Sequence, residues 1–389
     1  MDILVFNAGS SSLKYALIDS CTGQRRLSGL AERLGTPEAV LETQGQTIPL
    51  ANATVDQVVD QLLAVDQLTP EGIGHRVVHG GEYFSSATLI DEQVLATIAD
   101  CAHLAPLHNP ANLAGIVAMR TAFPHVPQVA VCDTAFHQTM PAEAYRYAVP
   151  DQWYSEHGVR RYGFHGTSHR FVAQRAAELL RQPLERVRLI TAHLGNGCSA
   201  CAVRDGISVD TTMGLTPLEG LVMGTRSGDL DPGIITYVMQ ATGRTAQQVT
   251  DDLNRRSGLL GLSGTSNDMR ALCAASAAGD ARAALAIEVF CYRLAKAIAA
   301  LAVPLGRLDA LVFTGGIGQH SVVVRSKTLA LLGILGLRED PTANAAHGRM
   351  SEGRITSAGI ALVIATDEEL TIARDTAAVI SNISSSVHS

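Results

Sequence analysis

The sequence FNAGSSSLK, residues 6–14, begins at the end of the apolar run ILVF and leads into YALID, a β-type run that ends in an acid. A turn of glycine and small polar residues beside an apolar strand is typical of a phosphate-binding loop. It is not a Walker A motif, because the chain contains no Gly-Lys dipeptide and the next segment is a strand. The stretch predicts a turn between two strands, which either is purely structural or binds phosphate.

The same pattern occurs a second time in the chain. Residues 3–19, ILVFNAGSSSLKYALID, align without a gap with residues 189–205, LITAHLGNGCSACAVRD, so that Gly9 falls on Gly195 and Asp19 on Asp205. This repetition indicates a duplicated domain. A third glycine turn, VFTGGIG at residues 312–318, could be an ordinary strand-to-helix connection. Together the three turns favour a nucleotide cleft between two similar halves, because backbone N–H groups in such turns can point at phosphate oxygens.

Strand and helix patterns alternate along the chain, which indicates α/β architecture. We expect strands followed by turns in residues 72–81 and 128–137, a strand ending in acids in residues 360–369, and a long helix over residues 281–303. Residues 168–180 read as a helix with Ser168 as its N-cap. Functional loops are expected beyond the carboxyl ends of the strands.

Composition limits the function classes. A chain of 389 residues, 47% hydrophobic and 17% charged, can form about two domains with large cores. Its net charge of -7 argues against a nucleic-acid binder that relies on a basic surface. The opening MDILVFNAGS lacks a basic n-region, and acidic and basic residues interrupt the apolar segment 283–305. We therefore expect no signal peptide, no membrane span and a cytoplasmic location.

The seven cysteines are scattered, as expected of a reduced protein rather than a disulfide scaffold. Cys198 and Cys201 form a CxxC pair inside an apparent strand. Odd spacing in a strand directs the two thiols to opposite faces. A redox or zinc site at this pair is therefore not expected.

The chain resembles the acetate/propionate kinase family, in the superfamily of actin, sugar kinases and heat-shock chaperones. Nine motifs in family order carry the likeness: FNAGSSSLK, GHRVVHGG, CDTAFHQT, RYGFHGTSH, HLGNG, MGTRSGDLDPG, SNDMR, GGIG and TDEEL. The resemblance implies two duplicated RNase H-like domains, residues 1–137 completed by about 370–389, and residues 138–369. It also implies a homodimer that uses ATP and Mg²⁺, or Mn²⁺, to convert acetate reversibly to acetyl phosphate and ADP.

Four residues match the family's catalytic positions: Arg76, Asp133, His165 and Arg226. Transfer between two anions needs fixed positive charge, and a guanidinium binds carboxylate and phosphoryl oxygens in a plane. Asp133 is usually regarded as a proton donor or acceptor in the family. Free acetate is already ionised at neutral pH, so orienting an arginine or holding Mg²⁺ is our preferred role for it. The spacing of His165 and His169 suggests zinc, but no H-E-x-x-H glutamate is present, and His169 reads as structural.

The remaining family positions concern metal, nucleotide and acid. Asn7 and Glu368 match the Mg²⁺ pair, although the sequence leaves Glu369 open as the partner. Nucleotide contacts map to Lys14, Ser10, Ser12, His193, Leu194, Gly195, Asn196, Gly197, Asp268, Met269, Arg270, Gly316, Ile317, Gly318, Gln319 and His320. The acyl pocket maps to Arg76, Val78, Leu107, Phe164 and Pro217.

Two alternatives to an acetate kinase stay open. A propionate kinase would share fold and mechanism, but bulky Val78 predicts a tight pocket that disfavours each extra methylene by about 1–3 kcal/mol. A non-catalytic ATP-binding switch would need a lost catalytic residue, and none is lost. The family usually continues GGIGEN, whereas this chain has Gln319 and His320, and SNDMRA lacks the usual acid after its arginine. These departures affect the expected nucleotide affinity.

Overall fold

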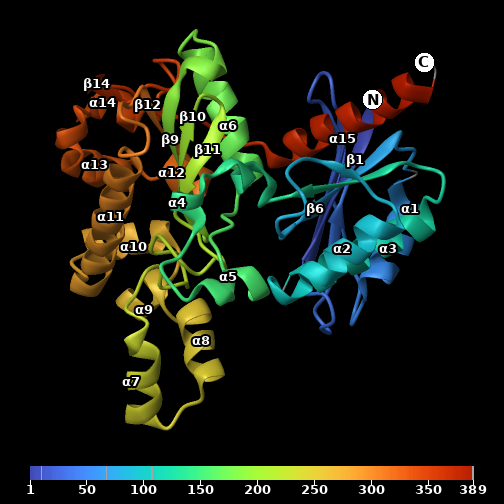
Figure 1. Cartoon of the computed structure of the whole chain (residues 1–389), viewed down its shortest axis with the longest axis horizontal. Coiled ribbons are helices and arrows are strands. Elements are labelled where there is room, and N and C mark those ends of the chain that lie inside the picture. The colour runs from blue at the N-terminus through green and yellow to red at the C-terminus, as the bar shows by residue number, and fades with distance from the viewer. Residues whose placement is uncertain (10, 67, 107, 388–389) are drawn as a thin grey trace. The chain divides into compact units, whose positions relative to one another are not determined.

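The computed structural model describes residues 1–9, 11–66, 68–106 and 108–387. The chain forms two compact units, residues 1–138 with 367–389, and residues 139–366. Each unit is an α/β structure built on one main sheet (Figure 1). Ser10 and Leu107, predicted at the ATP phosphates and in the acyl pocket, lie outside the described residues. The division of the chain into independently folding domains stays a prediction.

The first unit is built on an eight-stranded sheet with the strand order β5-β4-β3-β2-β1-β6-β8-β7. Its strands are β1 (Asp2–Ala8), β2 (Ser12–Asp19), β3 (Arg25–Glu32), β4 (Val40–Thr43), β5 (Gln46–Pro49), β6 (Gly72–Val77), β7 (Thr88–Leu89) and β8 (Gln128–Cys132). Its helices are α1 (Val55–Asp66), α2 (Glu92–Asp100), α3 (Asn109–Ala122) and α15 (Glu368–Val387). Strand β1 pairs antiparallel with β2 and parallel with β6.

Both faces of this sheet are covered. Alternate residues of β1 divide between two cores, with Ile3 and Val5 in the core that includes α15, and Leu4 and Phe6 in the core that includes α1 and α3. The middle of the strand, residues 3–6, is apolar throughout because both of its faces are buried. The C-terminal helix α15 thus belongs to the first unit and covers one face of its sheet (Figure 1).

The second unit is built on a five-stranded sheet with the order β11-β10-β9-β12-β15, beside a small β13-β14 sheet. Its strands are β9 (Arg188–Leu194), β10 (Cys198–Arg204), β11 (Ile207–Thr211), β12 (Ala310–Thr314), β13 (Arg338–Glu339), β14 (Thr356–Ala358) and β15 (Ala361–Val363). Its helices are α4 (Ala142–Tyr145), α5 (Asp151–His157), α6 (Gly166–Leu179), α7 (Gly233–Thr242), α8 (Ala246–Arg255), α9 (Gly258–Ser263), α10 (Met269–Ala277), α11 (Ala281–Leu301), α12 (Gly315–His320), α13 (Val322–Leu331) and α14 (Pro341–Ala345).

The two sheets share one topology, which confirms the predicted duplicated α/β fold. The order β3-β2-β1-β6-β8 of the first unit corresponds to β11-β10-β9-β12-β15 of the second. In both, an antiparallel hairpin is followed by parallel strands reached through helices. The carboxyl ends of β1 and β6, and of β9 and β12, therefore carry the segments that the sequence singled out.

The gapless alignment of the two hairpins is wrong by one residue in the second strand. The first hairpin closes at the pair Ala8 and Leu13, whereas the second closes at Leu194 and Cys198, so its turn is one residue shorter. As a result, the residue that pairs like Lys14 is Ser199 rather than Ala200. The alignment missed this because small residues fill both turns and each second strand contains an apolar run, YALI in one and ACAV in the other.

Three local predictions also need correction. Ser168 is not an N-cap, because α6 begins at Gly166 after His165, and the Ser168 hydroxyl hydrogen-bonds His193 instead. The predicted strand 360–369 is confined to β15, and its acids open α15. The long helix ends at Leu301 rather than 303. None of the helices in the described ranges is long and apolar enough to cross a membrane.

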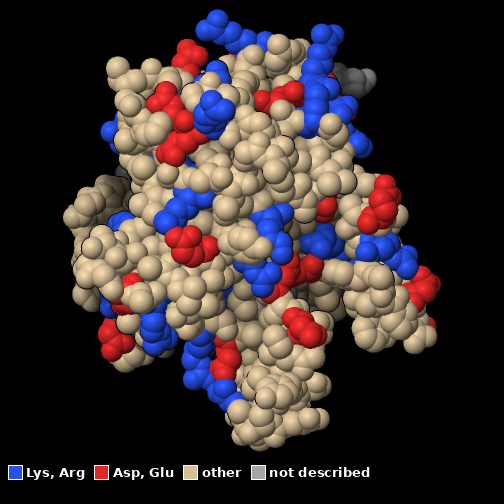
Figure 2. Space-filling model, turned by 90° about the vertical axis from the view of Figure 1, so that its left-hand side faces the viewer, with Lys and Arg blue, Asp and Glu red and all other residues tan. Residues whose placement is uncertain are grey.

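The surface carries charges of both signs close together. On the face drawn in Figure 2, basic and acidic side chains are interspersed with wide uncharged areas. Ion pairs of the second unit include Lys327 with Glu288 and Arg307 with Asp309.

Candidate active site

In the first unit, Arg76 and Asp133 form a two-point ion pair at the carboxyl ends of neighbouring strands. Arg76 Nε donates to Asp133 Oδ1 at 3.0 Å, and Nη2 donates to Oδ2 at 2.6 Å. The Asp133 side chain is 1% exposed and that of Arg76 is 23% exposed. The carboxylate raises the pKa of Arg76, so the guanidinium stays charged. Both carboxylate oxygens are occupied by one cation, which fixes the plane of the guanidinium.

Asn7 and Asn112 extend this arrangement. Arg76 Nη1 lies 3.5 Å from Asn7 Oδ1. The buried Asn112 donates through Nδ2 to the carbonyl of Ala8 at 2.6 Å and accepts from the N–H of Val78 at 3.0 Å. The amide thereby joins the segments that follow β1 and β6. Sequence reasoning missed Asn112, because its partners lie far away in the chain and no local pattern marks it.

The acids at the start of α15 differ in their contacts. Glu369 is 12% exposed and forms ion pairs with Lys14 at 2.7 Å and with Arg25. Glu368 lies near enough to Arg76 for its negative charge to contribute to the raised pKa of that arginine. Lys14, predicted at phosphate, is thus bound to a carboxylate in this structure. No local sequence pattern pointed to the Lys14–Glu369 pair, whose members lie far apart in the chain.

In the second unit, a histidine network surrounds the turn after β9. His165 has a left-handed backbone conformation, with φ of 57°, immediately before α6. Its Nδ1 lies 2.9 Å from Ser199 Oγ, and the same hydroxyl lies 2.8 Å from Nε2 of the fully buried His169. The rings of His165 and His193 stack with centroids 4.3 Å apart. His169 also hydrogen-bonds Thr191, which gives it a structural position.

Arg226 contrasts with Arg76. Its Nη1 donates to the carbonyl of Pro217 at 2.6 Å, and among the described residues it forms no ion pair with a carboxylate. Burial lowers its pKa from the ordinary value. A Cβ on Gly197 would lie 3.0 Å from Arg226 Nη2 and 3.5 Å from His165 Cε1. The glycine of HLGNG therefore lets the backbone lie against both side chains.

A cavity of about 730 Å³ lies in the second unit beside the same turn. Two predicted nucleotide segments and two residues of HLGNG contribute to its wall, together with apolar residues of α13. The lining residues are Gly195, Asn196, Asn267, Asp268, Met269, Arg270, Cys273, Gly316, Ile317, His320, Ser321, Val322 and Val323. A pocket of this size with apolar walls and a few polar groups suits a small organic ligand.

A family model described as the Acetokinase family matches residues 2–374. The chain belongs to the acetokinase family. It is 56% identical over 388 residues to the acetate kinase of Deinococcus radiodurans, across 97% of this chain and 98% of that protein. The propionate kinase of Francisella tularensis has a TM-score of 0.92 at 46% identity, covering 97% of this chain and 99% of that one. The acetate kinase of Porphyromonas gingivalis has a TM-score of 0.90 at 41% identity, with the same coverage. The predicted family, fold and enzyme class are confirmed.

Within this acetokinase-family fold, a buried arginine supports the cavity wall. Arg325 on α13 is 0% exposed, and Nη1 donates to the carbonyls of Gly318 and Gln319 at 2.8 Å each. Its Nε donates to the side-chain oxygen of Asn344 and its Nη2 to the carbonyl of Asn344. Nη2 also lies within hydrogen-bond distance of His347 Nδ1. Burial lowers the pKa of Arg325 to about 10. Through Nη1, the guanidinium holds the carboxyl end of α12, a helix that contributes Gly316, Ile317 and His320 to the cavity wall. No sequence motif pointed to this residue.

The residues predicted for the acyl pocket and for the two phosphate turns belong to different units. Val78 follows β6 in the first unit, whereas Phe164, which is buried, and Pro217 belong to the second. Ser12 opens β2, and its carbonyl accepts from the N–H of Gly9 at 2.7 Å. Leu194 is buried at the end of β9.

The CxxC cysteines, Cys198 and Cys201, lie in the interior of the second unit. Both thiols are buried, and burial raises the pKa of Cys198 and of Cys201 to about 12. Their sulfur atoms hydrogen-bond separate partners, the carbonyl of Gly195 and the hydroxyl of Ser208. Since the thiolate is the reactive and metal-binding form, these protonated thiols fit a core role.

Proposed function

We propose that this protein is an acetate kinase that catalyses acetate + ATP ⇌ acetyl phosphate + ADP. A carboxylate oxygen of acetate attacks the γ-phosphorus, one P–O bond forms, and the bond to the β-phosphate oxygen breaks as ADP leaves. The observation that supports this best is Arg226, a half-buried cation whose side-chain hydrogen bond, within the part of the chain that the structure describes, goes to the neutral carbonyl of Pro217. Such a group favours an anion, and relatives at 52–56% identity are named acetate kinases.

The reaction joins two anions, so its first requirement is positive charge. We assign Arg76 and Arg226 to the acetate carboxylate and the transferring phosphoryl group, where forked guanidinium groups can bind two oxygens each. His165, steadied by Ser199 and by stacking on His193, is assigned to the phosphoryl oxygens. Electrostatic stabilisation of this kind acts on charge that develops in the transition state.

Asp133 is assigned the role of orienting Arg76 rather than of removing a proton. The acid substrate is already ionised at neutral pH, because carboxyl groups titrate near about 4. Both oxygens of Asp133 are bound to the guanidinium, which leaves the carboxylate poorly disposed to act as a base. A general base needs reach to a proton that must be removed, and this reaction has none in the forward direction.

Mg²⁺ is the implied metal, with Mn²⁺ as a substitute, and the residues present fit it. Asn7 offers an amide oxygen and Glu368 a carboxylate, both hard oxygen donors near Arg76. The ion pairs of Glu369 with Lys14 and Arg25 favour Glu368 over Glu369 as the ligand. Mg²⁺ supplies charge neutralisation on the ATP phosphates when it is bound.

We assign the cavity of the second unit to the nucleoside part of ATP, and HLGNG to its phosphates. Gly316 and Ile317 present backbone and an apolar face, while His320 stands where the family usually has asparagine. Gln319 contributes its carbonyl to Arg325, and this contact does not depend on the side chain. The substitution at 319 therefore leaves this wall intact, and base preference would be decided chiefly at His320.

Propionate is the second candidate substrate, because a structure at 46% identity is named a propionate kinase. We expect acetate to be preferred, since Val78, Leu107, Phe164 and Pro217 are the assigned acyl contacts and Val78 is bulky. The test is acyl phosphate formation, trapped as the hydroxamate, from ATP with acetate or propionate. Absence of any acyl phosphate together with intact ATP binding would instead favour a non-catalytic switch. A homodimer and a cytoplasmic location remain part of the proposal.

A further inference from the structure

The segment that joins β11 to Arg226 has little regular secondary structure, yet its middle must be placed accurately. Residues 212–220, TMGLTPLEG, contain Pro217, whose carbonyl accepts the hydrogen bond of Arg226 Nη1. In a segment without regular structure, side chains must supply the partners that a helix or sheet would provide. The position of the Arg226 guanidinium therefore depends on what holds this loop.

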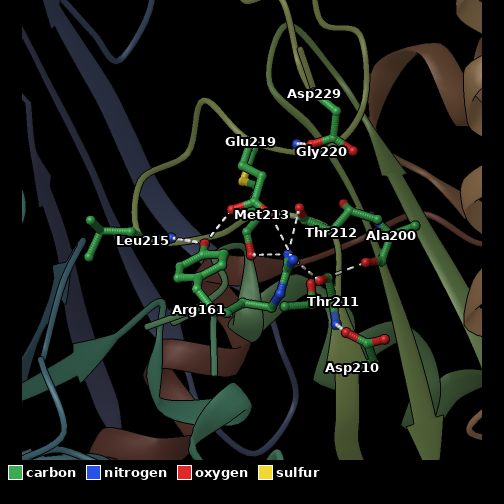
Figure 3. Close-up of polar contacts among 11 residues, drawn as sticks. Arg161, Ala200, Asp210, Thr211, Thr212, Met213, Leu215, Glu219, Gly220 and Asp229 are labelled. Atoms are coloured by element: carbon green, nitrogen blue, oxygen red, sulfur yellow. Dashed lines mark hydrogen bonds and ion pairs between the residues drawn. The ribbon is translucent and has the colours of Figure 1, made fainter. Parts of the chain in front are cut away.

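Arg161 holds the beginning of the loop (Figure 3). Its Nη1 donates to the carbonyls of Thr211, Thr212 and Met213, at 2.8, 2.9 and 3.2 Å. Its Nη2 donates to Glu219 Oε1 at 2.6 Å, near the other end of the loop. One guanidinium thus ties the strand end and the loop end together.

Tyr147 holds the middle of the loop through the same carboxylate. Its hydroxyl donates to Glu219 Oε2 and accepts from the N–H of Leu215 at 2.9 Å. Burial, with the negative charge of Glu219, raises the pKa of Tyr147, so the phenol stays protonated and remains a donor. Glu219 is the acceptor common to Arg161 and Tyr147, and each of its two oxygens has one of these donors.

Gly214 shows how closely the loop and these side chains fit. A Cβ at this position would lie 1.6 Å from Glu219 Oε2 and 2.1 Å from the Tyr147 hydroxyl. Any larger residue would have to displace the carboxylate from its two donors. The carbonyl of Gly214 also accepts from the N–H of Tyr162 at 3.1 Å, in the segment that leads to His165.

We propose that Glu219 is a positioning residue for Arg226. Held by Arg161 and Tyr147, it fixes residues 212–220, and through the Pro217 carbonyl it fixes the guanidinium that we assign to the reacting anions. This inference rests on the proposed function, because it gives Glu219 a purpose only if Arg226 acts in phosphoryl transfer. Misplacement of a catalytic group by about 1 Å can cost about 10²-fold in rate.

The first experiment compares Glu219→Gln and Tyr147→Phe with Glu178→Gln, an exposed glutamate paired with Arg175, as the matched control. We expect kcat/KM for acetate to fall at least about tenfold in both loop variants. The dissociation constant of ADP, measured by calorimetry, should stay within about twofold, because the loop is not part of the cavity wall. Circular dichroism checks that each variant is folded. Should Glu219→Gln fail to fold, Tyr147→Phe alone decides.

The second experiment combines Glu219→Gln with Arg226→Lys. If Glu219 acts through Arg226, its substitution should cost less than about twofold once the guanidinium is gone, because residues that act as a unit are not additive. Full additivity of the two losses, or wild-type kcat/KM in folded Glu219→Gln and Tyr147→Phe, would overturn the inference. A wild-type protein that forms no acyl phosphate would instead overturn the proposed function.

Discussion

Both carboxylate oxygens of Asp133 accept hydrogen bonds from Arg76, through Nε and Nη2. The third nitrogen of the same guanidinium, Nη1, lies 3.5 Å from Asn7 Oδ1. The three side chains come from the ends of adjacent strands, so the sheet itself sets their spacing. An arginine held in this way keeps one orientation when an anion arrives, and it need not lose rotamer freedom in the transition state.

Replacing Asp133 with Asn should therefore damage catalysis without removing a base. We expect kcat to fall by about 10²–10³-fold, because the guanidinium loses its charged partner and its fixed plane. The pH dependence of the residual kcat should keep the wild-type shape between about pH 6 and 9. Loss, in the variant, of a wild-type ionisation near neutrality would show that Asp133 is a base after all.

Arg226 should behave differently from Arg76 when stability is measured. Either Arg76→Ala or Arg226→Ala should lower kcat at least about 10²-fold. Arg76→Ala leaves the buried Asp133 carboxylate without its partner, which should also destabilise the fold by several kcal/mol, about 3–5. Arg226→Ala removes a half-buried charge that has no acidic partner among the described residues, so its unfolding midpoint in urea should stay close to wild type. Equal destabilisation by both would contradict this contrast.

Arg325 should control nucleotide binding through the cavity wall. Arg325→Met removes the guanidinium donor from the carbonyls of Gly318 and Gln319, although Gln319 keeps His347 Nδ1 at 2.9 Å. A buried carbonyl left without a donor costs about 1–3 kcal/mol. We expect the KM for ATP to rise more than that for acetate. Arg325→Lys should be intermediate, since an ammonium has three N–H donors and a guanidinium has five. Because Arg325 supports the wall of the nucleotide cavity, its loss should raise the KM for ATP more than the KM for acetate. An equal rise of both KM values would argue against this role.

Buried His75 should make stability depend on pH. Burial lowers its pKa to about 4, while it hydrogen-bonds Gln128 at 2.8 Å. The unfolded chain takes up a proton near about pH 6.5, so below that pH the unfolded state binds more protons and the free energy of unfolding falls. The loss develops as pH decreases from about 6.5 to 4 and amounts to about 3 kcal/mol.

Urea unfolding across this pH range measures the effect. His75→Gln should reduce the slope of unfolding free energy against pH, by up to about 1.4 kcal/mol per pH unit. The exposed His157→Gln serves as the control and should leave the slope unchanged. An identical slope in wild type and His75→Gln would mean that His75 titrates normally in the folded protein.

The duplicated hairpin and the family motifs were readable in the sequence because strand alternation and glycine turns are local signals. They predicted the α/β class and the three strands whose carboxyl ends carry Asn7, Arg76 and Asp133. Register was not readable, because a one-residue difference between two turns of small residues changes no local pattern. The prediction of Ser168 as an N-cap was wrong because the sequence does not show tertiary partners. Its hydroxyl hydrogen-bonds His193 in strand β9 rather than the helix backbone.

The contacts that support the site residues could not be predicted from the sequence, for another reason. Asn112, Arg325 and Glu219 act through backbone carbonyls or through partners distant in the chain, and such partners leave no spacing pattern. Lys14 is instructive, because a lysine beside a glycine-serine turn suggests phosphate, yet it forms an ion pair with Glu369 across the whole length of the sequence. Only the folded unit brings those two residues together.

The central claim concerns the acid that receives the phosphoryl group, and one steady-state comparison tests it. The purified protein is assayed with ATP, Mg²⁺ and acetate, propionate or butyrate, and acyl phosphate is trapped as the hydroxamate. We predict product with acetate, a kcat/KM for propionate lower by roughly 10–200-fold, and a still lower value for butyrate. Comparable kcat/KM for acetate and propionate would contradict the assignment of acetate as the preferred substrate. The absence of any acyl phosphate would contradict the proposal that the protein is a carboxylate kinase.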